Sequence, residues 1–235
     1  MARVLIVSFS VVPGPDRHGV QLPHVMKALA SRFAVDVLTT RVGELAYVER
    51  LHKTRMLRVP LPNAPLAQQV EAFRRALRRQ LEGAEYEIVH FRDAWSGIPI
   101  LEKQHAFGLR TVFDIGRSAM GEPRPADVQL AADLAAAEEV CWRKADLVLV
   151  PTAAGWRYLA ENGRVERVAI VPPGVDIDRF DCEIPDSFGV PQVVAVGTLA
   201  AGRGVRVLLR AMRDVLAITP CRLTLAGPIE KEFEA

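Results

Sequence analysis

Short apolar runs alternate along this chain with longer segments in which apolar residues recur at helical spacing. The first run, VLIVSFS at residues 4–10, lacks the polar alternation of a half-exposed strand. Such a run is typical of a parallel strand that is covered on both faces. After the next loop, Leu22, Val25, Met26 and Leu29 share one face of an expected helix. A chain that alternates these patterns should form parallel strands joined by crossover helices.

The alternation continues to residue 172 and defines a first domain. The expected strands are residues 4–10, 35–40, 55–60, 86–91, 110–115, 146–151 and 167–172. Helical patterns occupy residues 66–82, about 126–144 and 153–162. This order predicts the α/β class, with a doubly wound, mostly parallel, Rossmann-like sheet.

A rigid turn, Pro172-Pro173-Gly174, interrupts the pattern inside the segment VPPGVDIDRF. Proline fixes φ and removes a backbone donor, so this turn can end the last strand of a domain cleanly. The pattern restarts with a strand at 192–197, a helix at 203–218 and a strand at 222–227, which together make one βαβ unit. We therefore expect a first domain at 1–172, a linker at 173–190 and an incomplete second Rossmann-like domain at 191–235.

The composition excludes several classes of protein. Half of the 235 residues are hydrophobic, a quarter are charged, and the formal net charge is +2, so nothing demands a nucleic-acid or membrane partner. No apolar run reaches the ~18–20 residues that span a bilayer. The start MARVLIVSFSVV imitates a signal peptide, but PGPDRHG follows it in place of a small-residue cleavage site. A buried first strand is the better interpretation.

The pattern of cysteines and histidines argues against a disulfide framework and against a zinc site. Cys141, Cys182 and Cys221 lie far apart without Cys-x-x-Cys spacing, and the five histidines are scattered. This usage fits a reducing cytoplasm.

Familiar cofactor and catalytic motifs are missing as well. The loop VVPGPDRHGVQLPH after the first strand lacks the Gly-x-Gly-x-x-Gly fingerprint, and the chain has neither a Walker motif nor a Gly-x-Ser-x-Gly elbow. NAD or FAD binding in the usual manner is therefore not expected.

Five segments, taken together and in order, resemble the family-4 (group 1) glycosyltransferases, which use nucleotide sugars and have the GT-B fold. They are HGVQLPHVMKALASRFAVDVLTT (18–40), YEIVHFRDAWSG (86–97), RKADLVLVPTAAGWRYL (143–159), VAIVPPGVDIDRF (168–180) and VVAVGTLAAGRGVRVLLRAM (193–212). The third resembles the family's Ala-Asp-x-Val-x-x-x-Ser segment, the fourth its interdomain linker and the fifth its donor loop. The linker followed by the donor loop is the most specific of these matches.

The resemblance implies an acceptor-binding domain at 1–172, an interdomain linker at 173–190 and the beginning of a nucleotide-sugar-binding domain at 191–235. It also implies sugar transfer, with retention at the sugar carbon and without a cofactor or metal. The acceptor would be a sugar or a lipid-linked acceptor, and the enzyme would be cytoplasmic. Because the chain ends before the family's Glu-x(7)-Glu segment, the chain as given is expected to be an inactive fragment, with homodimerisation as one arrangement.

The donor-binding residues implied by the resemblance are Gly197, Thr198, Arg203 and Gly204. They join a strand to a helix, where backbone amides attract phosphate and an arginine can hold a diphosphate. Thr198 stands where the family has an arginine, and Arg203 where it has a lysine. The alternative is an ordinary strand–helix loop with a solvated arginine.

Candidate acceptor contacts are His18, Gly19, His24, Asp93, Asp114 and Arg117. Asp114 and Arg117 lie at the expected carboxyl end of a strand, where open α/β sheets bind ligands. The resemblance points to His18, Gly19 and His24. Gly19 is interpreted as letting a substrate approach the backbone. No catalytic residue is assigned, and the candidates are Asp114, Arg117 and His90. A core histidine at 90, a packing or capping role for His24 and a structural Asp114–Arg117 pair remain alternatives.

Four arginines, Arg74, Arg75, Arg78 and Arg79, share a helix face opposite Phe73. The default interpretation is a solvated face. The alternative is a patch for an anionic lipid head group, which would place the protein at the inner face of the membrane. Two other functions stay open for the whole chain: a non-catalytic module that binds sugar, lipid or a partner, and a nucleotide-sugar epimerase.

Overall fold

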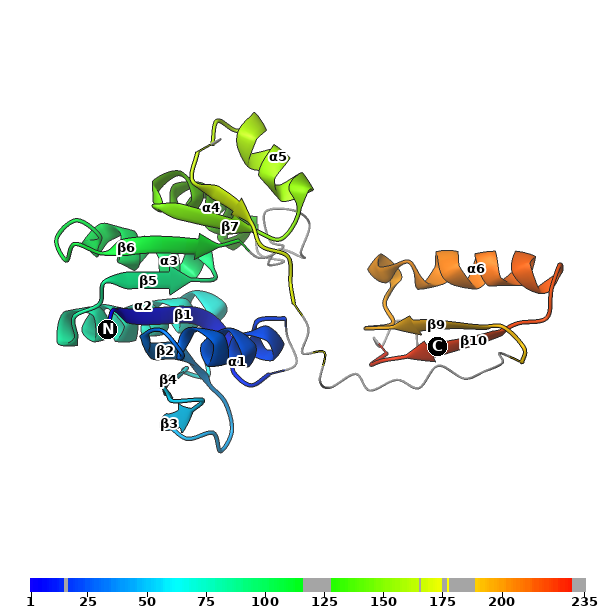
Figure 1. The fold of residues 1–235 in the computed structure, drawn as a ribbon, viewed down its shortest axis with the longest axis horizontal. Helices are drawn as coiled ribbons and strands as arrows, with labels where there is room; N and C mark the ends of the chain where they lie inside the picture. Colours follow the sequence, from blue (N-terminus) through cyan, green and yellow to red (C-terminus); the bar gives the residue numbers. More distant parts are fainter. Residues whose placement is uncertain (15–16, 116–127, 165, 175–176, 178–188, 230–235) are drawn as a thin grey trace. The chain divides into compact units, whose positions relative to one another are not determined.

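The structure is a computed structural model that describes residues 1–14, 17–115, 128–164, 166–174, 177 and 189–229 (Figure 1). The chain divides into two compact units, Met1–Asp176 and Ile177–Ala235. Each unit has its own sheet.

The first unit is built on an eight-stranded sheet with the order β3-β4-β2-β1-β5-β6-β7-β8. All neighbouring strands are parallel except β3 and β4. The strands are β1 (Arg3–Val11), β2 (Ala34–Arg41), β3 (Val48–Leu51), β4 (Thr54–Pro60), β5 (Ile88–Phe91), β6 (Arg110–Asp114), β7 (Leu147–Val150) and β8 (Val168–Ile170). The predicted α/β class with a doubly wound, mostly parallel sheet is confirmed.

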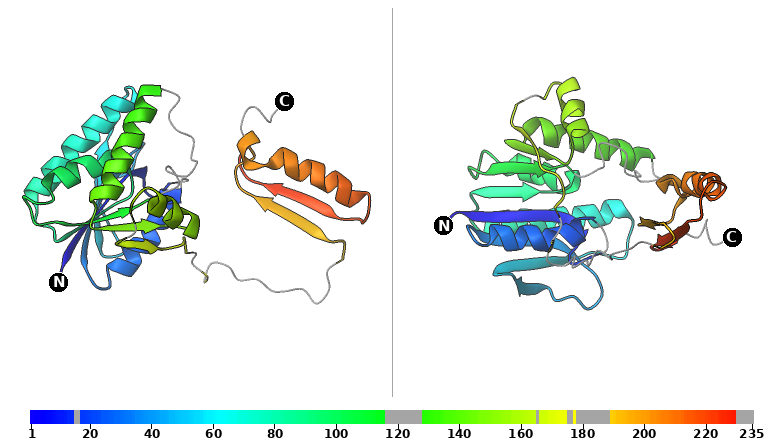
Figure 2. Two further views of the ribbon diagram at one scale, coloured as in Figure 1. Left: turned by 90° about the horizontal axis from the view of Figure 1, so that it is seen from above. Right: turned by 45° about the vertical axis from the view of Figure 1, so that its right-hand side comes forward.

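Helices cover both faces of this sheet (Figure 2). The helices are α1 (Arg17–Leu29), α2 (Leu66–Gly83), α3 (Ala94–Lys103), α4 (Val128–Lys144) and α5 (Ala153–Glu161). On one face, Leu22 and Met26 of α1 pack against Ile6 and Val37. On the other, α2, α3 and α4 share a larger core with β1, β5 and β6, and α3 packs between its two neighbours.

Helix α2 follows its sequence pattern closely. Val70, Phe73, Leu77 and Leu81 are its buried residues, and they recur at the three- and four-residue spacing of one helix face. Phe73 also meets the ring of Phe9 from β1 in an edge-on contact, with ring centroids 5.2 Å apart. The apolar stripe therefore fixes how this helix lies on the sheet.

Helix α3 was missed by the sequence analysis, which placed no helix between the strands expected at 86–91 and 110–115. The segment contains Gly97 and Pro99, and both residues disfavour helix locally. The structure shows why a glycine is needed: a Cβ at Gly97 would overlap the sulfur of Cys141 on α4. Close packing between α3 and α4 thus decides the conformation, and burial raises the pKa of the Cys141 thiol, which keeps it protonated.

Strand β3 was missed as well, so the sheet has eight strands where seven were expected. It is a short, mostly exposed edge strand that forms an antiparallel hairpin with β4. The two turn residues, His52 and Lys53, have φ values of 49° and 64°. A two-residue turn with positive φ usually contains Asn-Gly or Asp-Gly, which can be recognised in a sequence. This turn contains neither pair.

A polar network ties together the strands near their amino ends. The carboxylate of Asp36 on β2 is buried and accepts hydrogen bonds from Arg3 (2.8 Å), Arg55 (2.7 and 3.0 Å) and the hydroxyl of Tyr86 (2.7 Å). Burial alone would raise the pKa of Asp36, but the hydrogen bonds from Arg55, Tyr86 and Arg3 outweigh it and lower that pKa. Burial and the hydrogen bond to Asp36 raise the pKa of Tyr86 to about 12.

The second unit contains β9 (Gln192–Val196), a 3-10 turn at Ala201–Arg203, α6 (Val205–Leu216) and β10 (Arg222–Ala226). The two strands are parallel and α6 connects them, as the sequence pattern predicted. The helix expected from residue 203 begins at Val205, because Gly204 takes a φ of 75° and separates it from the turn.

Helix α5 offers a simple test of how a local contact contributes to stability. The hydroxyl of Thr152 caps the helix by accepting a hydrogen bond from the amide of Gly155 at 3.2 Å. We expect Thr152→Ala to lower the free energy of unfolding by about 1 kcal/mol, the usual value of such a cap. Urea denaturation followed by circular dichroism measures the change. Thr152→Ser keeps the capping oxygen and serves as the control, and an equal loss in both variants would contradict the capping role.

Candidate functional site

The first group of predicted site residues lies at the carboxyl ends of β1, β5 and β6 in the first unit. Ligands of open α/β sheets bind at this edge. The residues come from the loop between β1 and α1, from the start of α3 and from the end of β6. The fold therefore brings together residues that are almost a hundred positions apart in the sequence.

The loop between β1 and α1 is folded tightly on itself. A Cβ at Gly19 would overlap the carbonyl of Val11 and the backbone of Gly14, and a Cβ at Gly14 would overlap the same carbonyl. The sequence analysis interpreted Gly19 as letting a substrate approach the backbone, and an acceptor contact at Gly19 stays a prediction. The loop's own backbone fills the space that a Cβ at Gly19 would take, so Gly19 shapes the loop.

Arg58 on β4 anchors the same loop. Its side chain is fully buried and donates two hydrogen bonds to the carbonyl of Val12, from Nε at 3.1 Å and Nη2 at 3.0 Å. Nη1 donates to the carbonyl of Ala46, and Nη2 lies 2.7 Å from a carboxylate oxygen of Glu49. One guanidinium thus fixes two loops at the carboxyl edge. The sequence analysis did not single out Arg58.

A compact polar cluster occupies the ends of β5 and β6 on the face that α1 covers. Arg92, only 3% of whose side chain is exposed, donates from Nε to Oδ2 of Asp114 at 2.9 Å and from Nη2 to Oε1 of Gln21 at 3.1 Å. Nε2 of His90 lies 3.6 Å from the same Asp114 oxygen. His90 Nε2 and Arg92 Nη1 are both buried, and neither has a hydrogen-bond partner among the residues that the structure describes.

Asp93 has a well-defined structural role. Its Oδ1 accepts hydrogen bonds from the amide and hydroxyl of Ser96, both at 2.8 Å, and caps the start of α3. Its Oδ2 accepts from the amide of Phe9 on β1 at 2.6 Å. The carboxylate therefore locks the beginning of α3 to the end of β1, and an acceptor contact by Asp93 stays a prediction.

The remaining predicted residues of this group are His24, His18 and Arg117. His24 is exposed on α1. His18 belongs to the first turn of α1, but its side chain lies outside the described residues, and so does Arg117. Of the predicted residues, the structure joins His90 and Asp114 directly, and it adds Arg92 and Gln21. Arg92 could have been noticed, because it takes the place of the second histidine in the family's Val-His-x-His pattern.

The second group of predicted site residues forms the loop between β9 and α6. Gly197 ends β9 with a φ of 137°, and a Cβ at Gly227 would overlap its carbonyl oxygen. Thr198 is half-buried, Arg203 is exposed, and a cavity of about 390 Å³ opens between them and Leu208 of α6. The guanidinium of Arg203 makes no ion pair with any residue that the structure describes.

Helix α6 starts at this cavity without a side-chain cap. Gly204 precedes the helix and offers no side-chain cap to the amides of the first turn. The orphan amides at a helix start and the positive end of its dipole favour an anion. The four predicted donor residues, Gly197, Thr198, Arg203 and Gly204, all line this cavity.

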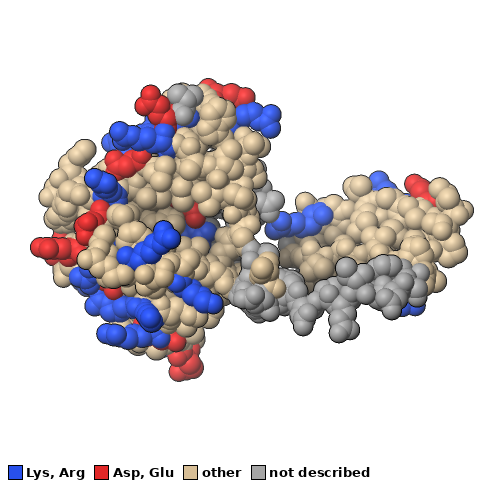
Figure 3. Space-filling view, viewed as in Figure 1, with Lys and Arg blue, Asp and Glu red and all other residues tan. Residues whose placement is uncertain are grey.

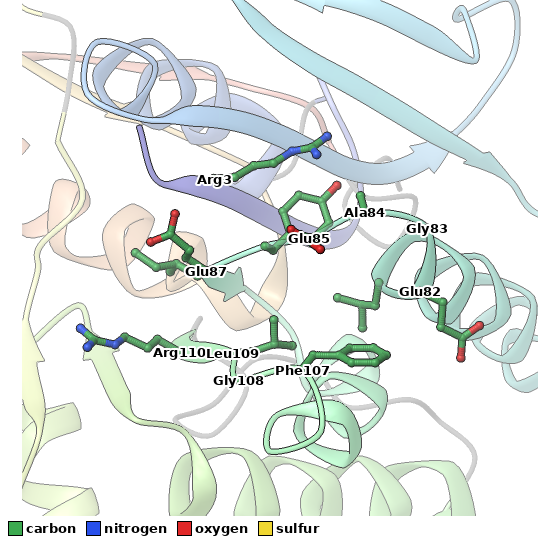
Figure 4. Close-up of a pocket in the computed structure, with 13 residues that line it drawn as sticks. Arg3, Glu82, Gly83, Ala84, Glu85, Glu87, Phe107, Gly108, Leu109 and Arg110 are labelled. Carbon is green, nitrogen blue, oxygen red and sulfur yellow. The ribbon is translucent and has the colours of Figure 1, made fainter.

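A larger cavity, of about 1270 Å³, lies at the opposite edge of the first sheet (Figure 4). The charged side chains of Arg3, Glu87 and Arg110 surround it, together with Tyr86 and Phe107. It lies at the amino ends of β5 and β6, whereas ligands of parallel sheets bind at the carboxyl ends. We therefore place the candidate acceptor site of the first unit at the carboxyl edge of its sheet.

The four arginines of α2 are not equivalent. Arg74 donates from Nε to the carbonyl of Trp95 at 2.8 Å, and Arg78 lies 3.4 Å from Glu71 and 3.8 Å from Glu102. Arg75 and Arg79 are exposed. On the face shown in Figure 3, basic and acidic side chains of the first unit are interspersed.

Two further observations concern metals and membranes. Within the described ranges, no three His, Cys, Asp or Glu side chains are grouped so that they could hold a metal ion. Among the helices that the structure describes, none is long and apolar enough to cross a membrane.

The sequence of the first unit matches a known protein family. A sequence model of glycosyltransferase family 4 matches residues 19–179, which include the whole cluster at the carboxyl edge. A search of curated proteins finds no sequence that matches the chain.

Solved structures share the fold at low sequence identity. Sucrose-phosphate synthase from Thermosynechococcus elongatus superposes with a TM-score of 0.75 at 17% identity, and the match covers 99% of this chain and 64% of that one. HepE from Anabaena, in complex with UDP and glucose, gives 0.65 at 16% identity, covering 100% and 63%. A Listeria monocytogenes protein assigned as a UDP-N-acetylglucosamine 2-epimerase gives 0.56 at 10% identity, covering 98% and 70%. The chain thus spans less than two thirds of the first two proteins.

Proposed function

The chain belongs to glycosyltransferase family 4, and from this premise we propose that it transfers a sugar from a nucleotide sugar to an acceptor. The observation that carries the proposal is the family match over residues 19–179. The nucleotide bound to a protein of the same fold, HepE with UDP and glucose, adds support.

We propose that the loop from Gly197 to Gly204 binds the diphosphate of the donor. Amides at the start of α6 would donate hydrogen bonds to phosphate oxygens, and Arg203 would add a guanidinium beside them. Because the glycosidic bond breaks with its electron pair going to the diphosphate, negative charge grows on the leaving group. Donors aimed at this charge would lower the barrier.

The acceptor would bind at the carboxyl edge of the first sheet, near His90, Arg92 and Asp114. In the proposed reaction, an acceptor hydroxyl oxygen forms the new bond to the sugar carbon and a phosphate oxygen of the donor takes the hydroxyl proton. Retention at the sugar carbon follows if attack and departure occur on the same side of the ring. This chemistry requires no protein nucleophile and no metal.

Thr198 allows a test of the loop's arrangement, because its family counterpart is an arginine. We expect Thr198→Arg to leave donor affinity unchanged or to raise it up to about tenfold, since a second guanidinium would face the diphosphate. Calorimetric titration with the nucleotide sugar measures the effect. Thr198→Val, which adds no charge, is the control. A marked loss of affinity in Thr198→Arg alone would show that the loop does not face the donor.

An activity assay distinguishes sugar transfer from the two alternatives. The chain, extended by the family's Glu-x(7)-Glu segment, is incubated with UDP-, GDP- and ADP-sugars, with and without sugar and lipid-linked acceptors, and nucleoside diphosphate release is followed. Release that requires an acceptor supports a transferase. Conversion of one nucleotide sugar into another without an acceptor indicates an epimerase, whose fold this chain shares, and binding without turnover indicates a binding module.

The remaining features of the proposal concern location and contacts. We propose a cytoplasmic enzyme whose membrane contact, if it has one, uses the exposed Arg75 and Arg79. Arg74 and Arg78 contact the carbonyl of Trp95 and two glutamates of the first unit. Only two of the four arginines of this helix face are therefore proposed to contact a membrane. Homodimerisation stays a prediction.

A further inference from the structure

The polar cluster around Asp114 contains two buried atoms to which no described residue offers a hydrogen bond. They are Nη1 of Arg92 and Nε2 of His90. More than nine in ten buried polar groups in proteins have a partner, and a missing one costs about 1–3 kcal/mol. Among the described residues, only two other buried side-chain nitrogen or oxygen atoms lack a partner, at Thr39 and Arg164.

The two atoms lie close to one carboxylate. His90 and Arg92 are alternate residues along the direction of β5, so both side chains leave the same face of the sheet. Asp114 Oδ2 lies 2.9 Å from Arg92 Nε and 3.6 Å from His90 Nε2. Asp114 and Gln21 hold the guanidinium of Arg92 in place through its Nε and Nη2 atoms. Its third nitrogen, Nη1, has no partner among the described residues.

The chemistry of the two atoms is complementary. An arginine nitrogen can only donate a hydrogen bond, whereas a ring nitrogen of a neutral imidazole can accept one. A hydroxyl group does both, because its oxygen accepts while its hydrogen is donated. One hydroxyl-bearing group could therefore satisfy Arg92 through its oxygen and His90 through its hydrogen.

The charges around the cluster disfavour an anionic group. The guanidinium of Arg92 is already balanced by Asp114, and the next residue, Asp93, brings a second carboxylate to the same strand end. A phosphate or carboxylate of a ligand would add further negative charge to a largely buried place, which is costly without a new cation. A neutral polyol avoids this cost.

We propose that His90 and Arg92 bind a hydroxyl group of an uncharged sugar unit of the acceptor, and that Asp114 and Gln21 position Arg92 for this contact. The inference rests on the proposed sugar transfer and narrows its acceptor class. Carbohydrate hydroxyls, and not the phosphate of a lipid head group, are what this part of the site recognises.

The test uses nitrogen-15 NMR of the His90 ring and the Arg92 guanidinium. The protein is titrated with glucose, galactose, mannose and sucrose, and separately with inorganic phosphate. We expect at least one sugar to shift both side-chain signals saturably and phosphate to leave them unmoved. Shifts caused by phosphate and not by sugars would overturn the proposal, as would the absence of any shift with all four sugars.

Variants separate a binding role from a structural one. Arg92→Lys keeps a positive charge near Asp114 but loses the fixed guanidinium, and we expect it to weaken sugar affinity about tenfold, as for one lost charge-assisted hydrogen bond. Arg110→Lys, on the exposed amino end of β6, is the matched control. Equal sugar affinity in Arg92→Lys and wild type would contradict the assignment.

A separate UDP titration, read from the amides of residues 197–204, distinguishes the two proposals. Sugar binding at His90 and Arg92 without any UDP response would leave this inference standing and count against the proposed donor site. A UDP response without sugar binding would support the proposed donor site and contradict the inference about His90 and Arg92.

Discussion

Replacing Arg203 with alanine is expected to weaken nucleotide-sugar binding about 5- to 150-fold, which corresponds to the loss of about 1–3 kcal/mol for a charge-assisted hydrogen bond. Arg203 lines the cavity at the start of α6 and makes no ion pair with a described residue, so its charge is available to a diphosphate. Isothermal titration calorimetry with the nucleotide sugar that supports turnover measures the change.

Arg210→Ala is the matched control for Arg203→Ala. Arg210 is exposed on the same helix but does not line the cavity. We expect the Arg210→Ala variant to bind the nucleotide sugar with the same affinity as the wild type. Equal affinity in the Arg203 variant would remove this loop from the donor site, whatever the activity of the protein.

Replacing Asp36 with asparagine is expected to lower the free energy of unfolding by about 2–4 kcal/mol. The buried carboxylate accepts hydrogen bonds from two arginines and a tyrosine. Asparagine keeps the shape but removes the charge. Arg3 and Arg55 are 39% and 40% exposed, so water can solvate them in part, which keeps the loss below that of a fully buried pair. Urea denaturation at neutral pH measures the difference.

The contribution of Asp36 should depend on pH in a defined direction. Its pKa is lower in the folded protein than the ordinary value of 3.8. The stabilisation is therefore fully present above that ordinary value and is lost as the pH falls through the lower, folded-state pKa. Wild type and Asp36→Asn should converge in stability as the solution becomes acidic. Glu85→Gln, an exposed change in the same region, should show no such trend, and a difference that persists unchanged into acid would contradict the account of Asp36.

The elements that could be predicted from the sequence are those whose pattern is set by burial alone. The run at residues 4–10 became the central strand β1, and the apolar stripe from Val70 to Leu81 became the buried face of α2. In both elements, the buried residues recur at the regular spacing of a strand or a helix, so the local sequence pattern is enough to predict the element.

Other elements depend on contacts that no local pattern contains. Helix α3 forms despite Gly97 and Pro99, because Gly97 lets the helix approach Cys141 on α4. Strand β3 is an exposed edge whose pairing with β4 relies on positive φ at His52 and Lys53. Neither requirement is visible in the residues of the segment alone.

The candidate site shows the same division. Sequence reasoning named His90 and Asp114 because they lie at the ends of expected strands, and the resemblance to a family named the loop at Gly197–Gly204. Neither named Arg92, Gln21 or Arg58, whose importance comes from hydrogen bonds between distant strands and helices. Neither showed that Gly19 shapes its loop, because the fold of the loop on its own backbone is a tertiary feature.

The structure of the reaction product tests the proposed function most directly. A nucleotide sugar labelled with carbon-13 at the anomeric carbon is incubated with a sugar acceptor and a version of the chain extended by the family's Glu-x(7)-Glu segment, and the products are examined by NMR and mass spectrometry. We predict a glycoside in which the labelled carbon is bonded to an acceptor oxygen with the donor's configuration, formed together with nucleoside diphosphate. Label found only in free sugar, or only in an epimerised nucleotide sugar, would contradict the account.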